Sequence, residues 1–194
     1  MAIRPATVAD IPQILEIYAP YIENTAYSFE YTVPTLAEFT LRFETITRQF
    51  PWLVWEEAGQ VLGYAYGSAP FERAAFGWCA EASIYLLPEA QGRGIGRQLY
   101  QQLEEILKAQ GYCKVYVLIT TENTASVAFH EAVGYTYTAT LPGCGWKFGR
   151  LHGIIWMEKQ LNSVELSMQP PVSANSVVKN NRKIGYILDK ITLS

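Results

Sequence analysis

The sequence contains 194 residues, of which 49% are hydrophobic, and its formal net charge at pH 7 is −3. A chain of this size can bury a substantial apolar core, so we expect one main globular domain. The small negative charge excludes a general attraction to nucleic acid or to anionic membranes. Cys79, Cys113 and Cys144 are odd in number and lack metal-ligand spacing, which predicts no metal site and favours a reducing compartment. The sequence shows no signal-peptide pattern and no run of the ~20 apolar residues needed for a membrane span, so we expect a soluble cytoplasmic protein.

The first half of the chain predicts a strand, two helices and a hairpin. Thr7 and Asp10 can cap the first helix, which should end near Asn24. Thr35 and Glu38 have the spacing of a capping box at the start of the second helix. The predicted elements are a strand at 2–4, helices at about 8–24 and 35–50, and antiparallel strands at 52–56 and 61–66.

Residues 82–108 predict a strand, a glycine-rich loop and a helix. Residues 83–87 form a short apolar run that ends at Pro88, and apolar side chains recur at helical spacing from Gly96 to Gly111. Three glycines at alternate positions before a helix allow several backbone N–H groups to approach a ligand. Together with the partial positive charge of the helix end, they predict an anion site.

The spacing of these glycines narrows the choice of anion. The pattern Gly-x-Gly-x-Gly lacks the Lys-Ser/Thr of a nucleotide P-loop, and its third glycine does not have the offset of a dinucleotide fingerprint. Thr120 and Thr121 follow the next strand, where a Rossmann unit would place an acidic residue. An ordinary glycine-rich turn is the alternative.

The second half predicts a buried strand, a helix and two further strands. They are a strand at 115–119, a helix at 123–133, and strands at 135–140 and 153–161 around a glycine-rich loop at 142–149. The composition then changes, because residues 162–194 contain Gln-Pro-Pro and a serine- and asparagine-rich stretch. We expect a domain of residues 1–161 followed by a flexible extension at 162–194 whose end forms a short helix.

Four separated motifs together resemble the GNAT acetyltransferase superfamily. In chain order they are Ile-Arg-Pro-Ala-Thr-x-x-Asp at 3–10, Trp-Cys-Ala-Glu at 78–81, Gln-Gly-Arg-Gly-Ile-Gly at 91–96 and the segment 123–135. Tyr-Ile-Glu-Asn-Thr at 21–25, Phe-Pro-Trp-Leu-Val at 50–54 and Phe-His-Glu-Ala-x-Gly-Tyr at 129–135 are similar to the phosphinothricin and methionine sulfoximine acetyltransferases. The resemblance covers about residues 1–161. It implies an α/β (α+β) fold, a twisted mixed sheet flanked by helices and splayed between the strands that end near Leu87 and begin near Val115.

The resemblance implies acetyl-CoA as the co-substrate. The loop would hold the pyrophosphate with help from Arg97, and the preceding strand would pair with the pantetheine amides and donate an N–H to the thioester carbonyl. Asn123 would bind pantetheine, cap its own helix, or both. The implied cofactor residues are Ile84, Tyr85, Leu86, Gln91, Gly92, Arg93, Gly94, Ile95, Gly96, Asn123 and Ser126.

Two side chains are implied in proton transfer. The acceptor must react as a free amine, and an α-amine has a pKa of ~7.7–8.0. Glu81, at the mouth of a buried strand, is the candidate base, with a structural hydrogen-bond anchor as the alternative. His130 shares a helical face with Asn123 and Ser126 and suits proton transfer near neutral pH as acid or base, although a lone helical histidine is more often structural.

The acceptor should be recognised by aromatic and charged side chains outside these motifs. They are Phe29, Glu30, Phe71, Arg73 and Phe76, with Lys147 and His152 as further candidates. Arg73 could clamp an α-carboxylate in a bidentate fashion. Phe71 stands where similar family members often carry a basic or polar residue, so a more apolar amino-acid analogue is an alternative acceptor.

The implied activity is N-acetylation of the α-amine of a small amino-acid-like acceptor such as phosphinothricin, methionine sulfoximine or methionine sulfone. One alternative is a GNAT enzyme for a polyamine or a protein N-terminus, and Arg73 argues against the polyamine. The other is a non-catalytic acyl-CoA-binding module, which Glu81 and His130 disfavour because binding alone needs neither. The family also implies a homodimer.

Overall fold

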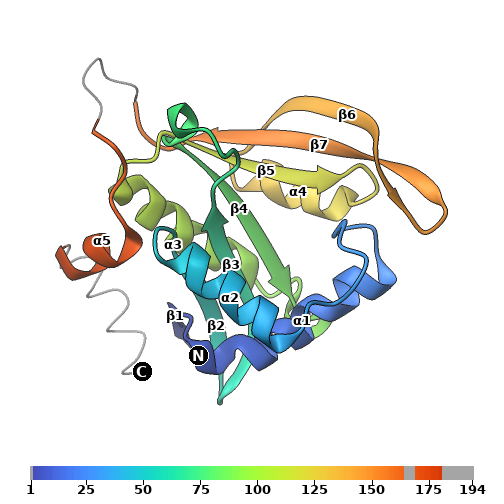
Figure 1. The fold of residues 1–194 in the computed structure, drawn as a ribbon, viewed down its shortest axis with the longest axis horizontal. Helices are drawn as coiled ribbons and strands as arrows, with labels where there is room; N and C mark the ends of the chain where they lie inside the picture. Colours follow the sequence, from blue (N-terminus) through green and yellow to red (C-terminus); the bar gives the residue numbers. More distant parts are fainter. Residues whose placement is uncertain (1, 164–168, 181–194) are drawn as a thin grey trace.

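A seven-stranded mixed sheet forms the centre of the molecule (Figure 1). The structure is a computed structural model, and it describes residues 2–163 and 169–180. The strands lie in the order β1-β2-β3-β4-β5-β7-β6. Only β4 and β5 pair in parallel; the other neighbours in the described sheet are antiparallel. The predicted mixed α/β architecture is confirmed.

The helices and strands follow the order expected from the sequence. They are β1 (Ala2–Pro5), α1 (Ile11–Asn24), α2 (Leu36–Thr47), β2 (Trp52–Glu57), β3 (Gln60–Ser68), β4 (Cys79–Leu86), α3 (Ile95–Gln110), β5 (Lys114–Thr120), α4 (Thr124–Ala132), β6 (Thr136–Lys147), β7 (Arg150–Gln160) and α5 (Ala174–Asn180). No helix within the described ranges is both long enough and apolar enough to cross a membrane.

Helices cover both faces of the sheet. Side chains alternate along a strand, so Trp52 and Val54 pack in the core beneath α1 and α2, whereas Leu53 and Trp55 pack in the core beneath α3. The same alternation assigns Ala80 and Ala82 of β4 to the α3 side. Glu81, Ser83 and Tyr85 therefore face the side of α1 and α2.

The two parallel strands separate after a short paired stretch. Cys79, Ala80 and Glu81 pair with residues 114–116 of β5, and in the described part of the chain these two strands pair at no other position. β4 continues to pair with β3 as far as Leu86. The predicted splay between β4 and β5 is confirmed, and Glu81 holds the last paired position before it.

The capping box predicted at Thr35 and Glu38 is confirmed. Thr7 and Asp10 instead form the capping box of a short 3-10 turn, Val8–Asp10, and α1 begins after that turn at Ile11. The Thr35 hydroxyl accepts a hydrogen bond from the Glu38 N–H at 3.3 Å, and the Glu38 carboxylate accepts one from the Thr35 N–H at 2.8 Å. The helix ends at Thr47, three residues before the predicted position. Phe50 lies beyond the helix end, and its ring stacks on Tyr112, with the centroids 5.3 Å apart.

The predicted glycine-rich loop at 142–149 is wrong. β6 continues to Lys147, and a tight turn at Phe148 and Gly149, both with left-handed φ, leads directly into β7. Gly145 is a strand residue, and a Cβ there would overlap the ring of Phe29. Glycine in this strand therefore allows another side chain to approach closely.

Part of the C-terminal extension lies against the domain. The backbone N–H of Val172 donates to the Gln110 carbonyl at 2.9 Å, and Ala174 and Val177 are buried in the core that contains α3. The short helix predicted near the C-terminus falls outside the described residues. The domain boundary at residue 161 stays a prediction.

Candidate active site

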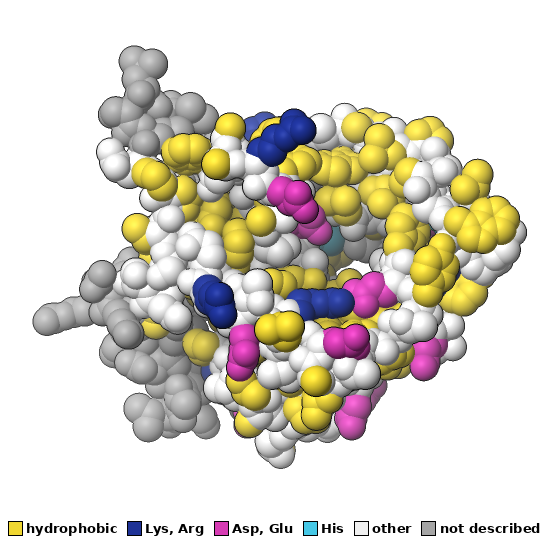
Figure 2. Space-filling view, viewed as in Figure 1, with side chains coloured by type: hydrophobic (Ala, Val, Ile, Leu, Met, Phe, Trp, Pro, Cys, Tyr) yellow, Lys and Arg dark blue, Asp and Glu magenta, His cyan; other side chains and the backbone are white. Residues whose placement is uncertain are grey.

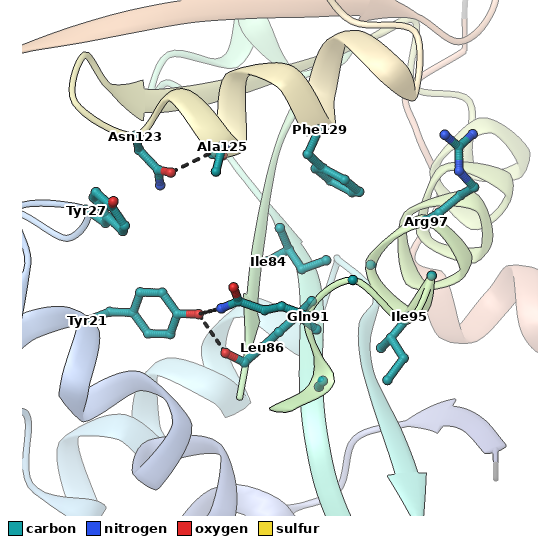
Figure 3. Close-up of a pocket in the computed structure, with 15 residues that line it drawn as sticks. Tyr21, Tyr27, Ile84, Leu86, Gln91, Ile95, Arg97, Asn123, Ala125 and Phe129 are labelled. Atoms are coloured by element: carbon teal, nitrogen blue, oxygen red, sulfur yellow. Dashed lines mark hydrogen bonds between the residues drawn. The ribbon is translucent and has the colours of Figure 1, made fainter. Parts of the chain in front are cut away.

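A cavity of about 470 Å³ lies between the glycine-rich loop, β4 and the start of α4 (Figure 3). Figure 3 shows α4 on one side of it and the loop leading into α3 on the other. Its lining residues are Tyr21, Tyr27, Ile84, Leu86, Ala90, Gln91, Gly92, Gly94, Ile95, Gly96, Arg97, Asn123, Ala125, Ser126 and Phe129. Most of the lining residues from β4 and the glycine-rich loop were predicted from the sequence. Of the four from the start of α4, Asn123 and Ser126 were predicted.

The backbone of the loop has the geometry of an anion cradle. Gly92 and Gly94 adopt left-handed φ values of 72° and 77°, and Gly94 is the N-cap of α3. A Cβ at either position would meet no atom within 4 Å, so the space beside the loop is open. The first N–H groups of a helix have no partner within that helix, and the helix dipole favours negative charge there.

Two predicted cofactor residues do not line this cavity. Arg93 turns away from it and pairs with Glu57 of β2, Nη2 to Oε2, at 2.8 Å. Tyr85 faces the opposite side of β4 and lines only the smaller cavity in the splay. The side chain that adds positive charge to the cavity wall is Arg97.

Tyr21 is a lining residue whose role the sequence analysis missed. Its hydroxyl donates to the Leu86 carbonyl at 2.6 Å and accepts from the Gln91 amide at 3.5 Å (Figure 3). The tyrosine therefore ties the end of α1 to the end of β4. The motif at residues 21–25 was the only sequence feature that pointed to it.

A second, smaller cavity of about 70 Å³ occupies the splay itself. It is lined by Tyr21, Tyr27, residues 82–85 of β4, Tyr100, residues 117–120 of β5, Asn123, Ser126 and His130. The predicted convergence of Asn123, Ser126 and His130 on one helical face is thus found at the splay. This cavity shares five lining residues with the larger one, so the two adjoin; they are Tyr21, Tyr27, Ile84, Asn123 and Ser126.

His130 is buried, and its hydrogen bonds determine its tautomer. Its Nδ1 lies 2.7 Å from the Ser126 carbonyl oxygen, which can only accept, so Nδ1 carries the hydrogen. Nε2 then accepts from the Tyr100 hydroxyl at 2.9 Å. Burial lowers the pKa of His130 to about 4, so the imidazole is neutral at pH 7. Tyr100 is 1% exposed, and a tyrosine on the apolar face of α3 was the overlooked sequence feature.

Glu81 has a different environment on the other face of the sheet. It lies beside Ser68 of β3 and Tyr116 of β5 in the strand register. No hydrogen bond or ion pair to its carboxylate is recorded among the described residues, and desolvation raises its pKa above the ordinary value. A carboxylate with a raised pKa, whose oxygen lone pairs accept no hydrogen bond from these residues, is suited to accept a proton.

The predicted acceptor residues are spread over the Glu81 side of the sheet and do not form one enclosed pocket. Phe71 stacks on Trp156 with ring centroids 5.7 Å apart and also contacts Phe76, while Arg73 is exposed. Glu30 pairs with Arg42 of α2 at 2.7 Å. Figure 2 shows a hollow on this face, with a histidine at its bottom and with acidic, basic and hydrophobic side chains around its rim. None of the five predicted acceptor residues lines either of the two cavities.

Lys147 and His152 are buried and bonded internally. The Lys147 ammonium donates to three backbone carbonyls, and His152 lies between Glu122 and the Lys147 carbonyl. Neither side chain lines the two cavities. In the described residues, no group of three or more His, Cys, Asp and Glu side chains has the arrangement of a metal site.

A family model, the acetyltransferase (GNAT) domain, matches residues 3–156. The chain belongs to the GNAT acetyltransferase family. It is 37% identical over 152 residues to a phosphinothricin N-acetyltransferase of Streptomyces viridochromogenes, covering 78% of this chain and 83% of the relative. It is 38% identical over 177 residues to an L-methionine sulfoximine/L-methionine sulfone acetyltransferase of Pseudomonas aeruginosa, covering 89% and 98%.

A solved GNAT structure shows the same fold. A phosphinothricin acetyltransferase from Sinorhizobium meliloti, crystallised in complex with AcCoA, superposes with a TM-score of 0.81 at 35% identity, covering 89% of this chain and 97% of the other. The family, fold class and enzyme class predicted from the motifs are confirmed. The roles of individual site residues stay predictions.

Proposed function

We propose that this GNAT enzyme acetylates the α-amine of a small amino-acid-like acceptor, of the phosphinothricin, methionine sulfoximine or methionine sulfone type. One observation carries the proposal: the cavity beside the glycine-rich loop adjoins the splay, and Glu81 holds the last paired position before that splay. The names of the two curated relatives and the crystal structure support the acceptor class.

The residues of the larger cavity fit acetyl-CoA. Gly92, Gly94 and the N-terminus of α3 suit its pyrophosphate, with Arg97 adding positive charge. β4 is unpaired beyond Glu81 on its β5 side, so its backbone groups can bond to the pantetheine amides. When bound, acetyl-CoA supplies the thioester whose acetyl group is transferred.

Glu81 is the proposed general base. It removes a proton from the acceptor ammonium, directly or through water, and so produces the free amine that can attack. His130 is neutral, and its Nε2 already accepts a hydrogen bond from Tyr100. Of the two predicted proton-transfer groups, the structure therefore favours Glu81, and His130 acts as acid or base only if the Tyr100 hydroxyl turns away.

Arg73 is the proposed partner of the acceptor carboxylate. Arg73 is exposed in the middle of the loop between β3 and β4, and the rings of Phe71 and Phe76 in the same loop contact each other. The stacked rings of Phe71 and Trp156 offer an apolar wall to the acceptor side chain. An arginine with an aromatic wall suits a zwitterionic acceptor whose side chain has an apolar stem.

We also propose a cytoplasmic homodimer in which the β6–β7 hairpin forms the interface. Leu141, Trp146, Phe148 and Leu151 of this hairpin are each more than two-fifths exposed. Exposed apolar side chains gathered on one element are typical of an interface. Sedimentation of the purified protein should give twice the mass of one chain.

The test of the proposed function is thiol release from acetyl-CoA against a panel of amines. The panel holds phosphinothricin, methionine sulfoximine, methionine sulfone, ordinary amino acids, spermidine and an N-terminal peptide. Turnover of the first three at the highest kcat/KM supports the proposal. Turnover of spermidine or the peptide alone would show that the acceptor is a polyamine or a protein N-terminus and not an amino acid. Acetyl-CoA binding without turnover would indicate a binding module.

A further inference from the structure

The side chain of Lys147 is buried at a junction between the β6–β7 hairpin and the end of α1. It is 3% exposed, and its Nζ donates to the carbonyl oxygens of Ile22, Thr25 and Ser28 at 2.7, 2.9 and 2.7 Å. A neutral amine has only two hydrogens, so three carbonyl acceptors require the ammonium form. Lys147 is therefore fully occupied as a donor and has no proton left for a ligand.

The three carbonyls lie at the end of α1 and in the loop that follows it. Ile22 is in the last turn of α1, where carbonyls have no partner within the helix, and Thr25 is its C-cap. Ser28 lies one residue before Phe29. A buried ammonium would be costly without such acceptors, and the carbonyls would be unsatisfied without the ammonium. Each therefore requires the other.

This loop, residues 25–30, carries one side chain that lines the cavities and two of the residues predicted to recognise the acceptor. Tyr27 lines both cavities. Phe29 packs against Gly145 of β6, and Glu30 pairs with Arg42 on the acceptor face. The position of these side chains depends on how the backbone of the loop is anchored to the β6–β7 hairpin.

The backbone of Lys147 is held in turn from the start of α4. His152 Nε2 donates to the Lys147 carbonyl at 2.9 Å, and Nδ1 lies 2.8 Å from the Glu122 carboxylate. Glu122 immediately precedes Asn123, which lines the larger cavity. A continuous set of contacts thus joins the acceptor loop, the hairpin and the wall of the cofactor cavity.

We propose that Lys147 is a positioning residue that holds the 25–30 loop against the β6–β7 hairpin and thereby sets the affinity for the amine acceptor. The inference rests on the proposed function, because it needs an acceptor on this face. It assigns Lys147 an indirect role, in place of the direct acceptor contact that the sequence suggested. Of the fifteen residues lining the larger cavity only Tyr27 belongs to the loop, so acetyl-CoA binding should change little.

The experiment compares Lys147→Met with the matched control Lys159→Met. Lys159 is a partly buried lysine of the same hairpin, and its Nζ contacts Glu104 and the Val133 carbonyl at 2.6 and 2.7 Å, beside α3 and α4. In Lys147→Met the acceptor KM should rise at least tenfold while the acetyl-CoA KM stays within threefold. In Lys159→Met both KM values should stay within threefold. Lys147→Gln, which keeps two donors, should give an intermediate acceptor KM and serves as the test if the methionine variant does not fold.

Amide hydrogen exchange gives a second readout that needs no acceptor. Peptides covering residues 22–31 should exchange at least tenfold faster in Lys147→Met and unchanged in Lys159→Met. An unchanged acceptor KM in a folded Lys147 variant, or equal exchange in the two variants, would overturn the inference. Failure of the proposed function is distinguishable, because the unmodified enzyme would then acetylate none of the amino-acid acceptors while the exchange difference would persist.

Discussion

Replacing Gly94 with alanine should weaken acetyl-CoA binding by more than its effect on stability explains. Gly94 has φ of 77°, and an L-residue in this region costs roughly 1–2 kcal/mol. The melting temperature should therefore fall by roughly 2–8 °C in a chain of this size. The new Cβ would enter the open space beside the loop, where we expect the pyrophosphate. Losing one hydrogen bond to a charged group costs about 1.5–3 kcal/mol, which corresponds to roughly a 10- to 100-fold rise in the acetyl-CoA KM.

Gly59→Ala is the matched control for this prediction. Gly59 lies in the β2–β3 turn with φ of 83°, and a Cβ there also meets no atom within 4 Å. It does not line either cavity. The melting temperature of the control, measured by differential scanning fluorimetry, should fall by a similar amount. Its acetyl-CoA KM in the thiol-release assay should not change. Equal acetyl-CoA KM values in the two variants would refute the assignment of the loop as the anion site.

Three further predictions concern the splay and the acceptor face. Glu81→Gln should lower kcat by about 10²–10⁴-fold. In the unmodified enzyme, kcat/KM should decline as the pH falls through the Glu81 pKa, which burial raises, in addition to the decline caused by protonation of the acceptor amine. The variant should keep only the decline caused by the amine, and identical pH profiles in the two enzymes would contradict the base assignment. Tyr100→Phe leaves the buried His130 Nε2 without its donor and should cost about 1–3 kcal/mol in urea unfolding, whereas unchanged stability would argue against this hydrogen bond. Arg73→Ala should raise the acceptor KM at least tenfold without changing the acetyl-CoA KM, and an unchanged acceptor KM would exclude the carboxylate clamp.

The sequence predicted the fold well because its local patterns agree with the tertiary structure. The capping box at Thr35, the glycine stop at Gly111 and the buried strand β5 each combine a local preference with a matching apolar pattern. The two strands of the β6–β7 hairpin were predicted, but their continuation through residues 142–149 was missed for the opposite reason. Gly143 and Gly145 favoured a loop, and the contact that makes a glycine necessary at 145 comes from Phe29, which is far away in the sequence.

The site was predicted where it depends on backbone and missed where it depends on long-range contacts. The glycine loop and the face shared by Asn123 and His130 follow from spacing alone. Arg93 turns toward Glu57, and the Tyr100 hydroxyl donates to the lone pair of His130. Each of these contacts joins residues that are more than 25 positions apart in the sequence. Such pairs leave no local pattern, so only the structure identifies them.

The most direct test of the central claim is mass spectrometry of the products after incubation with acetyl-CoA and L-methionine sulfone. The account predicts one product, N-acetyl-methionine sulfone, formed together with free CoA and greatly reduced in the Glu81→Gln variant. Absence of the acetylated amino acid, with acetyl-CoA left intact, would contradict the account.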